Sequence, residues 1–494
     1  MLATVLKTVS NTMSDIKKND IVELDITAVS NLGYGVGRTE SGKVVFTPGT
    51  VTGERVSVKI IKITKGYLVG KLIEILSKSN LRDLGDKCTA PATCGGCAYR
   101  FIKYEHELEL KKQNVKSEFD KVGLHDVKIL DTACVRDENG DAVIWHYRNK
   151  AQYRFAKIGD LVTAGFYASG THRVIGNEAC PLQPVIFGEI TRTVCEFAEK
   201  YNISVYEEEN GKGLLRHLYI RSGSGDCGEI CVCLVINGNE FPHAESLVDL
   251  LTYKFSRIVG IVINVNRKNS NLILGDEYKT IWGKCGISDV FCGVELDVSP
   301  AAFYQVNHDA AELLCRTAAD IADLKGEEHL LDLYCGIGSV GLSMANRVRR
   351  LTGVEIVPQA VECAIKNAER AGIANSKFIC ADSADGAADI LAKADELPDI
   401  VVIDPPRKGC APELLDSLTN AGIKKIVYIS CNPATLARDC AHLIKQGWNI
   451  GNVQPVDLFP RTGHVESVVC LSREKADDYV RVSIYTEDLK LRTT

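Results

Sequence analysis

The chain has 494 residues and a formal net charge of −6, and 45% of its residues are hydrophobic while 25% are charged. The length exceeds the roughly 100–200 residues of one domain, and the composition excludes fibrous, disordered and small disulfide-stapled proteins. The charge excludes a uniformly basic nucleic-acid binder. No apolar run approaches the ~20 residues that span a bilayer, and residues 1–8 lack the features of a secretion signal. We therefore expect a cytoplasmic protein with no membrane contact and mostly reduced cysteines.

Residues 15–76 are predicted to form a small β-barrel, because short runs of alternating apolar and polar residues are separated there by glycine-containing turns. Tyr34 or Tyr67 could stack on a base, as in oligonucleotide-binding barrels. The alternative is a structural barrel with a solvated charged edge. The barrel carries a basic run with no acidic residue inside it, made of Arg55, Lys59, Lys62, Lys65 and Lys71.

A central domain is predicted from residues 77–98 and 124–290, and it contains a candidate metal site. Cys88, Cys94 and Cys97 have the spacing C-x5-C-x2-C, and Cys180 follows further along the chain, before a proline. Four thiolates suit either tetrahedral zinc or a four-iron cluster, and the spacing favours neither. A set of four cysteines indicates a closed, structural site.

Residues 99–123 are predicted to form an amphipathic helix that packs on the catalytic domain. Strand-like runs dominate from there to about residue 290, so the central domain is expected to be rich in β-strands. Long hydrogen-bond donors gather in residues 146–152 and in Arg216-His217. They either hold phosphates or form an ordinary polar surface.

Residues 291–473 alternate between strands and helices, which predicts a Rossmann-like domain. A strand runs into the turn Gly336-Ile-Gly338-Ser-Val-Gly341 and then a helix, and Glu355 ends the next strand. Such glycines let a ligand approach the backbone, and the carboxylate can hold ribose hydroxyls. The pattern suits S-adenosylmethionine or NAD, so an NAD-dependent oxidoreductase is the alternative from another class.

Further polar residues follow the later strands of this domain. Asp382, Asp404 and Cys431 each come after a strand-like run, and Glu466 precedes the last one. The carboxyl ends of parallel strands line one crevice. A thiolate that adds to C6 of uracil makes C5 nucleophilic enough to take a methyl group, and a carboxylate can then remove the C5 proton. Cys431 is therefore the candidate nucleophile and Glu466 the base, against the alternative that Cys431 is a buried filler.

Four sequence motifs stand out in residues 291–473: Asp332-Leu-Tyr-Cys-Gly-Ile-Gly, Asp404-Pro-Pro-Arg-Lys-Gly, Ser430-Cys-Asn-Pro-Ala-Thr-Leu-Ala-Arg-Asp and Phe459-Pro-Arg-Thr-Gly-His-Val-Glu-Ser. They resemble those of the RNA uridine-5-methyltransferase family, specifically its branch with a TRAM barrel and an iron–sulfur cluster, which methylates 23S rRNA. The resemblance covers most of the chain, since the barrel, the four cysteines and residues 147–152 also match.

The resemblance implies roles for individual residues. S-adenosylmethionine would be contacted by Gln305 at its amino-acid end, by Tyr334 beside the glycine turn, by Glu355 at the ribose and by Asp382 on the adenine side. Asp404 falls at a further cofactor-binding position, while Cys431 and Glu466 match the nucleophile and the proton acceptor. A structural [4Fe–4S] cluster would be held by Cys88, Cys94, Cys97 and Cys180.

The expected fold is multidomain α/β: a TRAM barrel resembling an OB fold, a β-rich central domain with the iron–sulfur site, and a Rossmann-like class I methyltransferase domain. The expected partner is RNA with an unpaired or extruded uridine, most simply large-subunit rRNA, and no protein partner is implied. A tRNA methyltransferase is the alternative within the family. The alternative outside enzymes is a non-catalytic RNA-binding protein, which would not need Cys431, Glu466, Asp404 and Glu355 together. Residues 474–494, including Tyr479–Ser483, form an extension with no role in the pattern.

Overall fold

The computed structural model describes residues 16–85, 87–225, 228–270, 272–393 and 397–473. The expectations for residues 1–8 and for the extension at 474–494 lie outside this part of the chain. Two compact units make up the molecule. The small unit contains the chain up to residue 86 together with 97–110 and 461–463, and the large unit contains the remainder.

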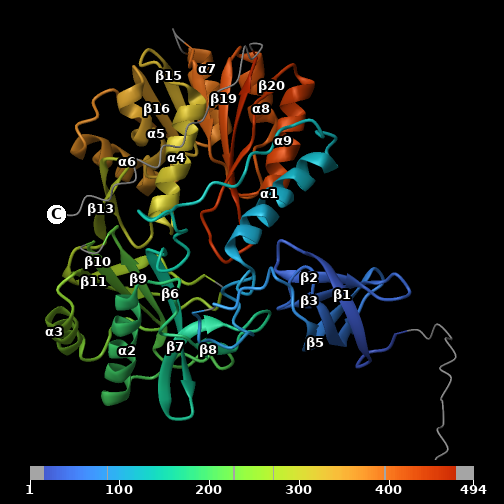
Figure 1. The fold of residues 1–494 in the computed structure, drawn as a ribbon. Helices are drawn as coiled ribbons and strands as arrows, with labels where there is room; N and C mark the ends of the chain where they lie inside the picture. The colour runs from blue at the N-terminus through green and yellow to red at the C-terminus, as the bar shows by residue number, and fades with distance from the viewer. Residues whose placement is uncertain (1–15, 86, 226–227, 271, 394–396, 474–494) are drawn as a thin grey trace, which may run out of the picture. The chain divides into compact units, whose positions relative to one another are not determined.

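The small unit is built on a closed barrel with strand order β1-β2-β3-β5-β4, drawn in blue in Figure 1. Alternate residues point inward, so that Val45, Val58 and Leu68 are fully buried, whereas much of β4 and β5 is exposed. The predicted barrel is confirmed. Its strands are β1 (Ile21–Val29), β2 (Tyr34–Arg38), β3 (Val44–Pro48), β4 (Arg55–Ile63) and β5 (Tyr67–Ser77).

A short return of the chain belongs to the small unit as well. Arg461, almost fully buried, donates from Nη1 to the Ile102 carbonyl at 2.7 Å and from Nη2 to Asp83 at 2.7 Å. A Cβ on Gly463 would lie 1.8 Å from the Asn31 carbonyl oxygen. This close approach explains why the motif that contains Glu466 has glycine at that position.

The central part of the large unit is a seven-stranded sheet of order β12-β11-β10-β9-β6-β7-β8. Helices α2 (Val185–Lys200) and α3 (Ala244–Lys254) pack on it, although the sequence predicted mainly strands here. Both faces of β9 and β10 are buried. The strands are β6 (Lys150–Ile158), β7 (Leu161–Tyr167), β8 (Val174–Gly176), β9 (Leu215–Ser222), β10 (Ile230–Ile236), β11 (Ile258–Val265) and β12 (Glu277–Gly283).

The C-terminal part of the large unit is a mostly parallel sheet of order β17-β16-β15-β18-β19-β22-β20, with β21 paired to β22. It confirms the predicted methyltransferase-type fold, and helices cover both of its faces (Figure 1). The strands are β15 (His329–Leu333), β16 (Arg350–Glu355), β17 (Ser376–Cys380), β18 (Ile400–Ile403), β19 (Lys425–Ser430), β20 (Asn449–Ile450), β21 (Gln454–Val456) and β22 (Glu466–Ser472).

Each face of this sheet has its own apolar core. One core includes residues of α4, α5 and α6, and the other includes residues of α8 and α9 together with Val115 and Phe119 of α1. A separate hairpin of β13 (Ile287–Phe291) and β14 (Val294–Val298) precedes α4. The helices are α1 (Tyr104–Lys121), α4 (His308–Ala322), α5 (Ser339–Met344), α6 (Pro358–Arg370), α7 (Ser383–Lys393), α8 (Pro412–Asn420) and α9 (Pro433–Lys445), and a 3-10 turn η1 (Ala345–Arg347) follows α5.

Within the described residues, the helices are too short or too polar to cross a membrane.

Candidate functional site

The predicted site residues of the catalytic domain gather at one edge of its sheet. Strands β15 to β19 are parallel, so their carboxyl ends meet at this edge and place Glu355, Asp382, Asp404 and Cys431 along it. Strand β22 runs in the opposite direction and begins there, at Glu466. Its register pairs Ser467 with Ser430, so that Glu466 lies beside Cys431.

The glycine turn after β15 is shaped by positive backbone φ angles. Tyr334 has φ of 67°, and Gly336 and Gly338 have 57° and 86°. The Gly336 N–H donates to Oε2 of Glu355 at 3.1 Å, and the Val357 N–H donates to Oε1 at 2.9 Å. Because both carboxylate oxygens are held by backbone amides, the Glu355 side chain is fixed in direction beside the turn.

Asp332 also belongs to this site, although the sequence offered it only as part of a motif. Its Oδ2 accepts from the Gly341 N–H at 2.9 Å, while Oδ1 is buried with no hydrogen-bond partner. Burial raises the pKa of Asp332 to about 8, and the charges of Asp404 and Glu355 add to the effect. An acid within the buried strand, one residue before its end and ahead of a glycine turn, was the signal that could have identified it.

Two further carboxyls share this protonation behaviour. Burial raises the pKa of Asp404 to about 7. Burial and the charge of Asp404 raise the pKa of Glu466 to about 8, against the opposing effect of Arg407. Packed acids of like charge in a poorly solvated edge cannot all ionise, so protons are held at the edge near neutral pH. This property suits groups that exchange protons during a reaction.

Cys431 lies between β19 and α9 and is half-buried. Burial raises the pKa of its thiol to about 11, helped by the charges of Glu466 and Asp404 and opposed by Arg407. These charges place the thiol near the carboxyl of Glu466 and near the cation of Arg407. The charge of Arg407 lowers the pKa of the thiol, and the sequence offered this residue only as part of a motif.

The loop that carries Arg407 is tied to α9. The Asn432 side chain donates to the Arg407 carbonyl at 2.8 Å and also caps the helix by accepting from the Ala434 N–H. Asp439 accepts from the Cys410 N–H at 2.9 Å. Gly409 has φ of 75°, and a Cβ there would lie 2.7 Å from Asp439. The loop that carries Arg407 and Cys410 is thus held by the N-cap and by a side chain of the same helix, α9.

A buried ion pair holds the chain before Glu466. Lys111 Nζ lies 2.7 Å from Asp457 Oδ1, both side chains are fully buried, and the same ammonium donates to the Phe459 carbonyl at 3.2 Å. Removing one partner leaves a buried charge uncompensated, which costs about 3–5 kcal/mol.

We therefore expect Lys111→Met to lower the free energy of unfolding by that amount in a urea titration. Lys112→Met is the matched control. Its ion pair with Asp131 is exposed and should be worth less than about 1 kcal/mol. Equal effects of the two substitutions would contradict the role given to Lys111.

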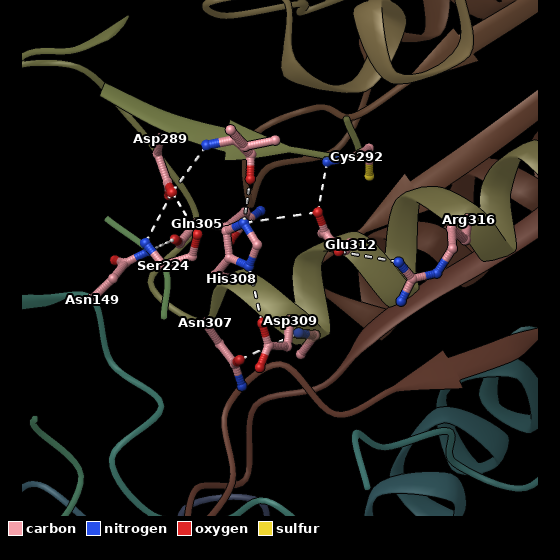
Figure 2. Close-up of polar contacts among 12 residues, drawn as sticks. Asn149, Ser224, Asp289, Cys292, Gln305, Asn307, His308, Asp309, Glu312 and Arg316 are labelled. Carbon is pink, nitrogen blue, oxygen red and sulfur yellow. Dashed lines mark hydrogen bonds and ion pairs between the residues drawn. The ribbon is translucent and has the colours of Figure 1, made fainter. Parts of the chain in front are cut away.

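Gln305 lies in the segment between β14 and α4, and Figure 2 shows its surroundings. The Asn149 side chain donates to the Gln305 carbonyl at 2.9 Å. Two residues later Asn307 caps α4 and donates to the Leu458 carbonyl at 3.1 Å. Three parts of the chain that are distant in sequence thus fix the Gln305 backbone.

His308 begins α4 and contributes to the same network (Figure 2). Burial lowers its pKa, but Asp309, Asp289, the Val290 carbonyl and Glu312 outweigh burial and raise the pKa to about 9. The protonated His308 side chain therefore stabilises the folded protein. This contribution is fully present below about pH 6.5, which is the ordinary pKa of histidine, and is lost as the pH rises through 9.

In denaturant titrations at pH 6.5 and 9.5, we expect the wild type to lose about 3 kcal/mol more stability than His308→Gln over this interval. Parallel pH profiles for the two proteins would contradict the assignment.

Cations gather on the strands β6 and β9. Lys150 is paired in register with Arg221, and burial together with Arg221 and Arg148 lowers the pKa of Lys150 to about 8. Arg148 Nε and Arg221 Nη1 are buried without a hydrogen-bond partner. Buried cationic groups without an anion are costly, so this cluster favours an anionic ligand.

The four predicted metal-ligating cysteines are divided between the units: Cys88, Cys94 and Cys180 lie in the large unit and Cys97 in the small one. Burial raises the pKa of Cys180 to about 11, and the thiols of Cys88 and Cys94 add to it. Backbone hydrogen bonds join residues 93–95 to 167–169. Cys88, Cys94 and Cys180 therefore lie in one region of the large unit. In the part of the chain that the structure describes, no group of three or more His, Cys, Asp or Glu side chains has the arrangement of a metal site.

The chain is similar to RNA methyltransferases over most of its length. The family model of tRNA (uracil-5-)-methyltransferases matches residues 293–474, and the model of the TRAM domain matches residues 17–73. An uncharacterised RNA methyltransferase of Clostridium acetobutylicum is 38% identical over 93% of this chain and 98% of its own. One of Halalkalibacterium halodurans is 36% identical over 94% of this chain and 99% of its own.

Among solved structures, the fold resembles that of the Pyrococcus abyssi tRNA (uracil-54, C5)-methyltransferase in complex with S-adenosyl-L-homocysteine. The TM-score is 0.72 at 24% identity, and the match covers 91% of this chain and 100% of the other. These findings favour neither the oxidoreductase nor the non-catalytic alternative. The chain belongs to the family of S-adenosylmethionine-dependent RNA (uracil-5-)-methyltransferases.

Proposed function

We propose that this enzyme methylates C5 of a uridine in large-subunit (23S) rRNA through a covalent adduct between Cys431 and C6 of the base. The supporting observation is the position of Cys431 beside Glu466, with Asp404 and Arg407 close enough to affect the ionisation of both. Nucleophile, base and an activating cation are thus available at the edge where the family binds its methyl donor.

The Cys431 thiol loses its proton to water and its sulfur bonds to C6, which moves the electrons of the C5–C6 double bond towards C5 and the adjacent carbonyl. C5 then takes the methyl group, and the sulfonium becomes a thioether. Glu466 removes the proton from C5, the C6–sulfur bond breaks, and the double bond returns as the thiolate leaves.

Residues of the glycine turn are proposed to hold the methyl donor. Glu355 is fixed by two backbone amides and is directed to the ribose, and Tyr334 lies beside the turn. Asp382 is exposed and caps α7 through the Ala384 N–H at 2.9 Å, on the side proposed for the adenine. Gln305 is proposed for the amino-acid end and Asp404 for a further contact.

RNA binding is proposed for two surfaces. The barrel exposes its basic strand β4 and Tyr67, which suit binding of the single-stranded RNA beside the target uridine. The cluster of Arg148, Lys150 and Arg221 needs an anion, and a phosphate of the substrate can supply it. This cluster lies near the catalytic edge, because Arg148 of the cluster and Arg407 of the edge both act on His464. Burial and the charges of Arg407, Lys111 and Arg148 lower the pKa of His464.

We also propose that Cys88, Cys94, Cys97 and Cys180 hold a [4Fe–4S] cluster. The support is the chemistry of the four residues, since soft thiolates are the usual ligands of such a cluster, and the charges of Cys88 and Cys94 act on Cys180. The cluster would supply cross-links between distant parts of the chain.

Anaerobically purified protein should contain about four iron and four sulfide per chain, and Cys180→Ser should lose them, whereas Cys195→Ser should not. Zinc in their place would overturn the assignment.

The substrate is tested with unmodified RNA. The full chain is incubated with labelled S-adenosylmethionine and either 23S rRNA or tRNA, both made without modification, and the methylated nucleoside is identified and mapped. The proposal expects 5-methyluridine in 23S rRNA. Transfer to tRNA alone would support the second candidate, which is favoured by the fold shared with an archaeal enzyme named for tRNA. In either case the reaction belongs in the cytoplasm.

A further inference from the structure

Two thiols outside the proposed reaction face the same pocket of the large unit. Cys292 is half-buried and Cys315 is 4% exposed, and both are free. The pocket has a volume of about 340 Å³, which admits a small molecule. It is lined by Cys292 and Gly293, by Glu312, Cys315, Arg316 and Ala319 of α4, by Ser343 of α5, and by Asn346 and Arg347.

The hairpin β13–β14 brings Cys292 to this pocket. Cys292 and Gly293 form its two-residue turn, with φ angles of 50° and 79°. Both central residues are thus in the left-handed region, as in a type I′ turn. A glycine is suited to this conformation, and the cysteine is not. Cys292 is therefore held in its position by contacts beyond the turn.

Helix α4 supplies these contacts. The Cys292 N–H donates to Oε1 of Glu312 at 2.6 Å, and His308 bonds through Nε2 to the Val290 carbonyl at 2.8 Å, as Figure 2 shows. Cys315 lies one turn after Glu312, on the same face of the helix. These two hydrogen bonds hold the hairpin on α4 and so keep Cys292 on the same pocket as Cys315.

The two thiols lie close enough for Cys292 to affect the ionisation of Cys315. Hydrogen bonding with Cys292, together with burial, raises the pKa of Cys315 well above the ordinary value for cysteine. Buried cysteines are usually inert fillers, but two thiols that face one pocket have the arrangement of a reactive thiol and its resolving partner. Neither thiol has a part in the proposed methyl transfer.

We propose that Cys292 and Cys315 are a redox-modification site, which a small disulfide entering the pocket converts into an intramolecular disulfide. The Cys292 thiolate attacks one sulfur of the reagent and releases one thiol. Cys315 then loses its proton and attacks the Cys292 sulfur, which releases the second thiol. Two protein thiols are oxidised and one reagent disulfide is reduced.

This cross-link has a structural consequence. It closes residues 292–315 into a loop and joins the hairpin to α4 covalently, and this loop includes Gln305. A closed loop lowers the entropy of the unfolded chain, so the oxidised protein should unfold at a higher temperature than the reduced one. Because the buried Cys315 must lose its proton, the second step should accelerate as the pH rises.

The test uses the full chain and 2-hydroxyethyl disulfide as the oxidant. Remaining thiols are alkylated, and the protein is cleaved after glutamate, which separates Cys292 from Cys315 at Glu295 and Glu312. We expect mass spectrometry to find the two peptides joined through Cys292 and Cys315, and reductant to reverse both the link and the rise in the thermal midpoint.

Two variants make the assignment specific. Cys292→Ser should abolish the joined peptides, whereas Cys285→Ser, which changes an exposed cysteine in the same peptide as Cys292, should leave them unchanged. Fragmentation of the joined peptides distinguishes the two cysteines in the wild type. Alkylation of both Cys292 and Cys315 after full oxidant treatment, or a stable mixed disulfide on Cys292 that Cys315 never displaces, would overturn the proposal.

Discussion

Cys431→Ala is expected to reduce methyl transfer to RNA by at least about 10⁴-fold, because loss of a catalytic nucleophile removes the covalent route altogether. Uracil C5 is too weakly nucleophilic to attack the methyl donor without prior addition of sulfur to C6. The half-buried position of Cys431 means that the substitution removes few packing contacts. The fold and the binding of S-adenosylmethionine should therefore persist. The measurement is transfer of labelled methyl under single-turnover conditions.

The control for this experiment is another thiol at the same sheet edge. Cys380 ends β17 and is exposed, and Cys380→Ala should retain the wild-type rate. Denaturing gel electrophoresis should show an adduct of wild-type protein with RNA that contains 5-fluorouridine at the target, because fluorine replaces the C5 proton and cannot be removed by a base. A Cys431→Ala protein that still methylates at more than about a tenth of the normal rate would exclude the covalent mechanism.

Glu466→Gln is expected to lower turnover by about 10²–10⁴-fold, which is the usual contribution of a positioned general base. Glutamine has nearly the same shape and no charge, so it fits the 4%-exposed site without unfolding the protein. The step that this substitution blocks, removal of the C5 proton, comes after methyl transfer. The methylated base should therefore remain bonded to Cys431, and the adduct should accumulate with natural uridine in place of the fluorinated base.

The pKa values also predict a pH profile. Glu466 acts as a base only when ionised, and its pKa is raised to about 8 by burial and by Asp404. The Cys431 thiol, with its pKa raised to about 11, also reacts only after losing its proton. Because the thiol must ionise before methyl transfer, kcat/KM for RNA should keep rising with pH towards 11. Glu466 acts after that step, so its ionisation should appear as a rise through pH 8 in the rate at which the adduct breaks down.

The control for the glutamate experiment is a double substitution. Cys431→Ala combined with Glu466→Gln should form no adduct, since the sulfur that holds the RNA is gone. A Glu466→Gln enzyme with normal turnover, or one that transfers no methyl group and forms no adduct, would show that another group removes the C5 proton.

Much of the architecture follows from local patterns in the sequence. Alternation of apolar and polar residues predicted the barrel, because a strand that has one buried face requires a period of two. The sequence also placed Glu355, Asp404 and Cys431 after strands, and parallel strands must bring such positions to one edge. It did not predict α2 and α3 in the central domain, where tertiary packing on the sheet stabilises helices that local sequence did not reveal.

The ionisation of the site and its supporting contacts were decided by the tertiary structure alone. The pKa values of Asp332, Asp404 and Glu466 depend on burial and on one another's charge across different strands. The pair Lys111–Asp457 joins residues 346 positions apart. Sequence periodicity reports which face of an element is buried, but Coulomb and desolvation energies depend on distances between elements, which exist only once the chain has folded.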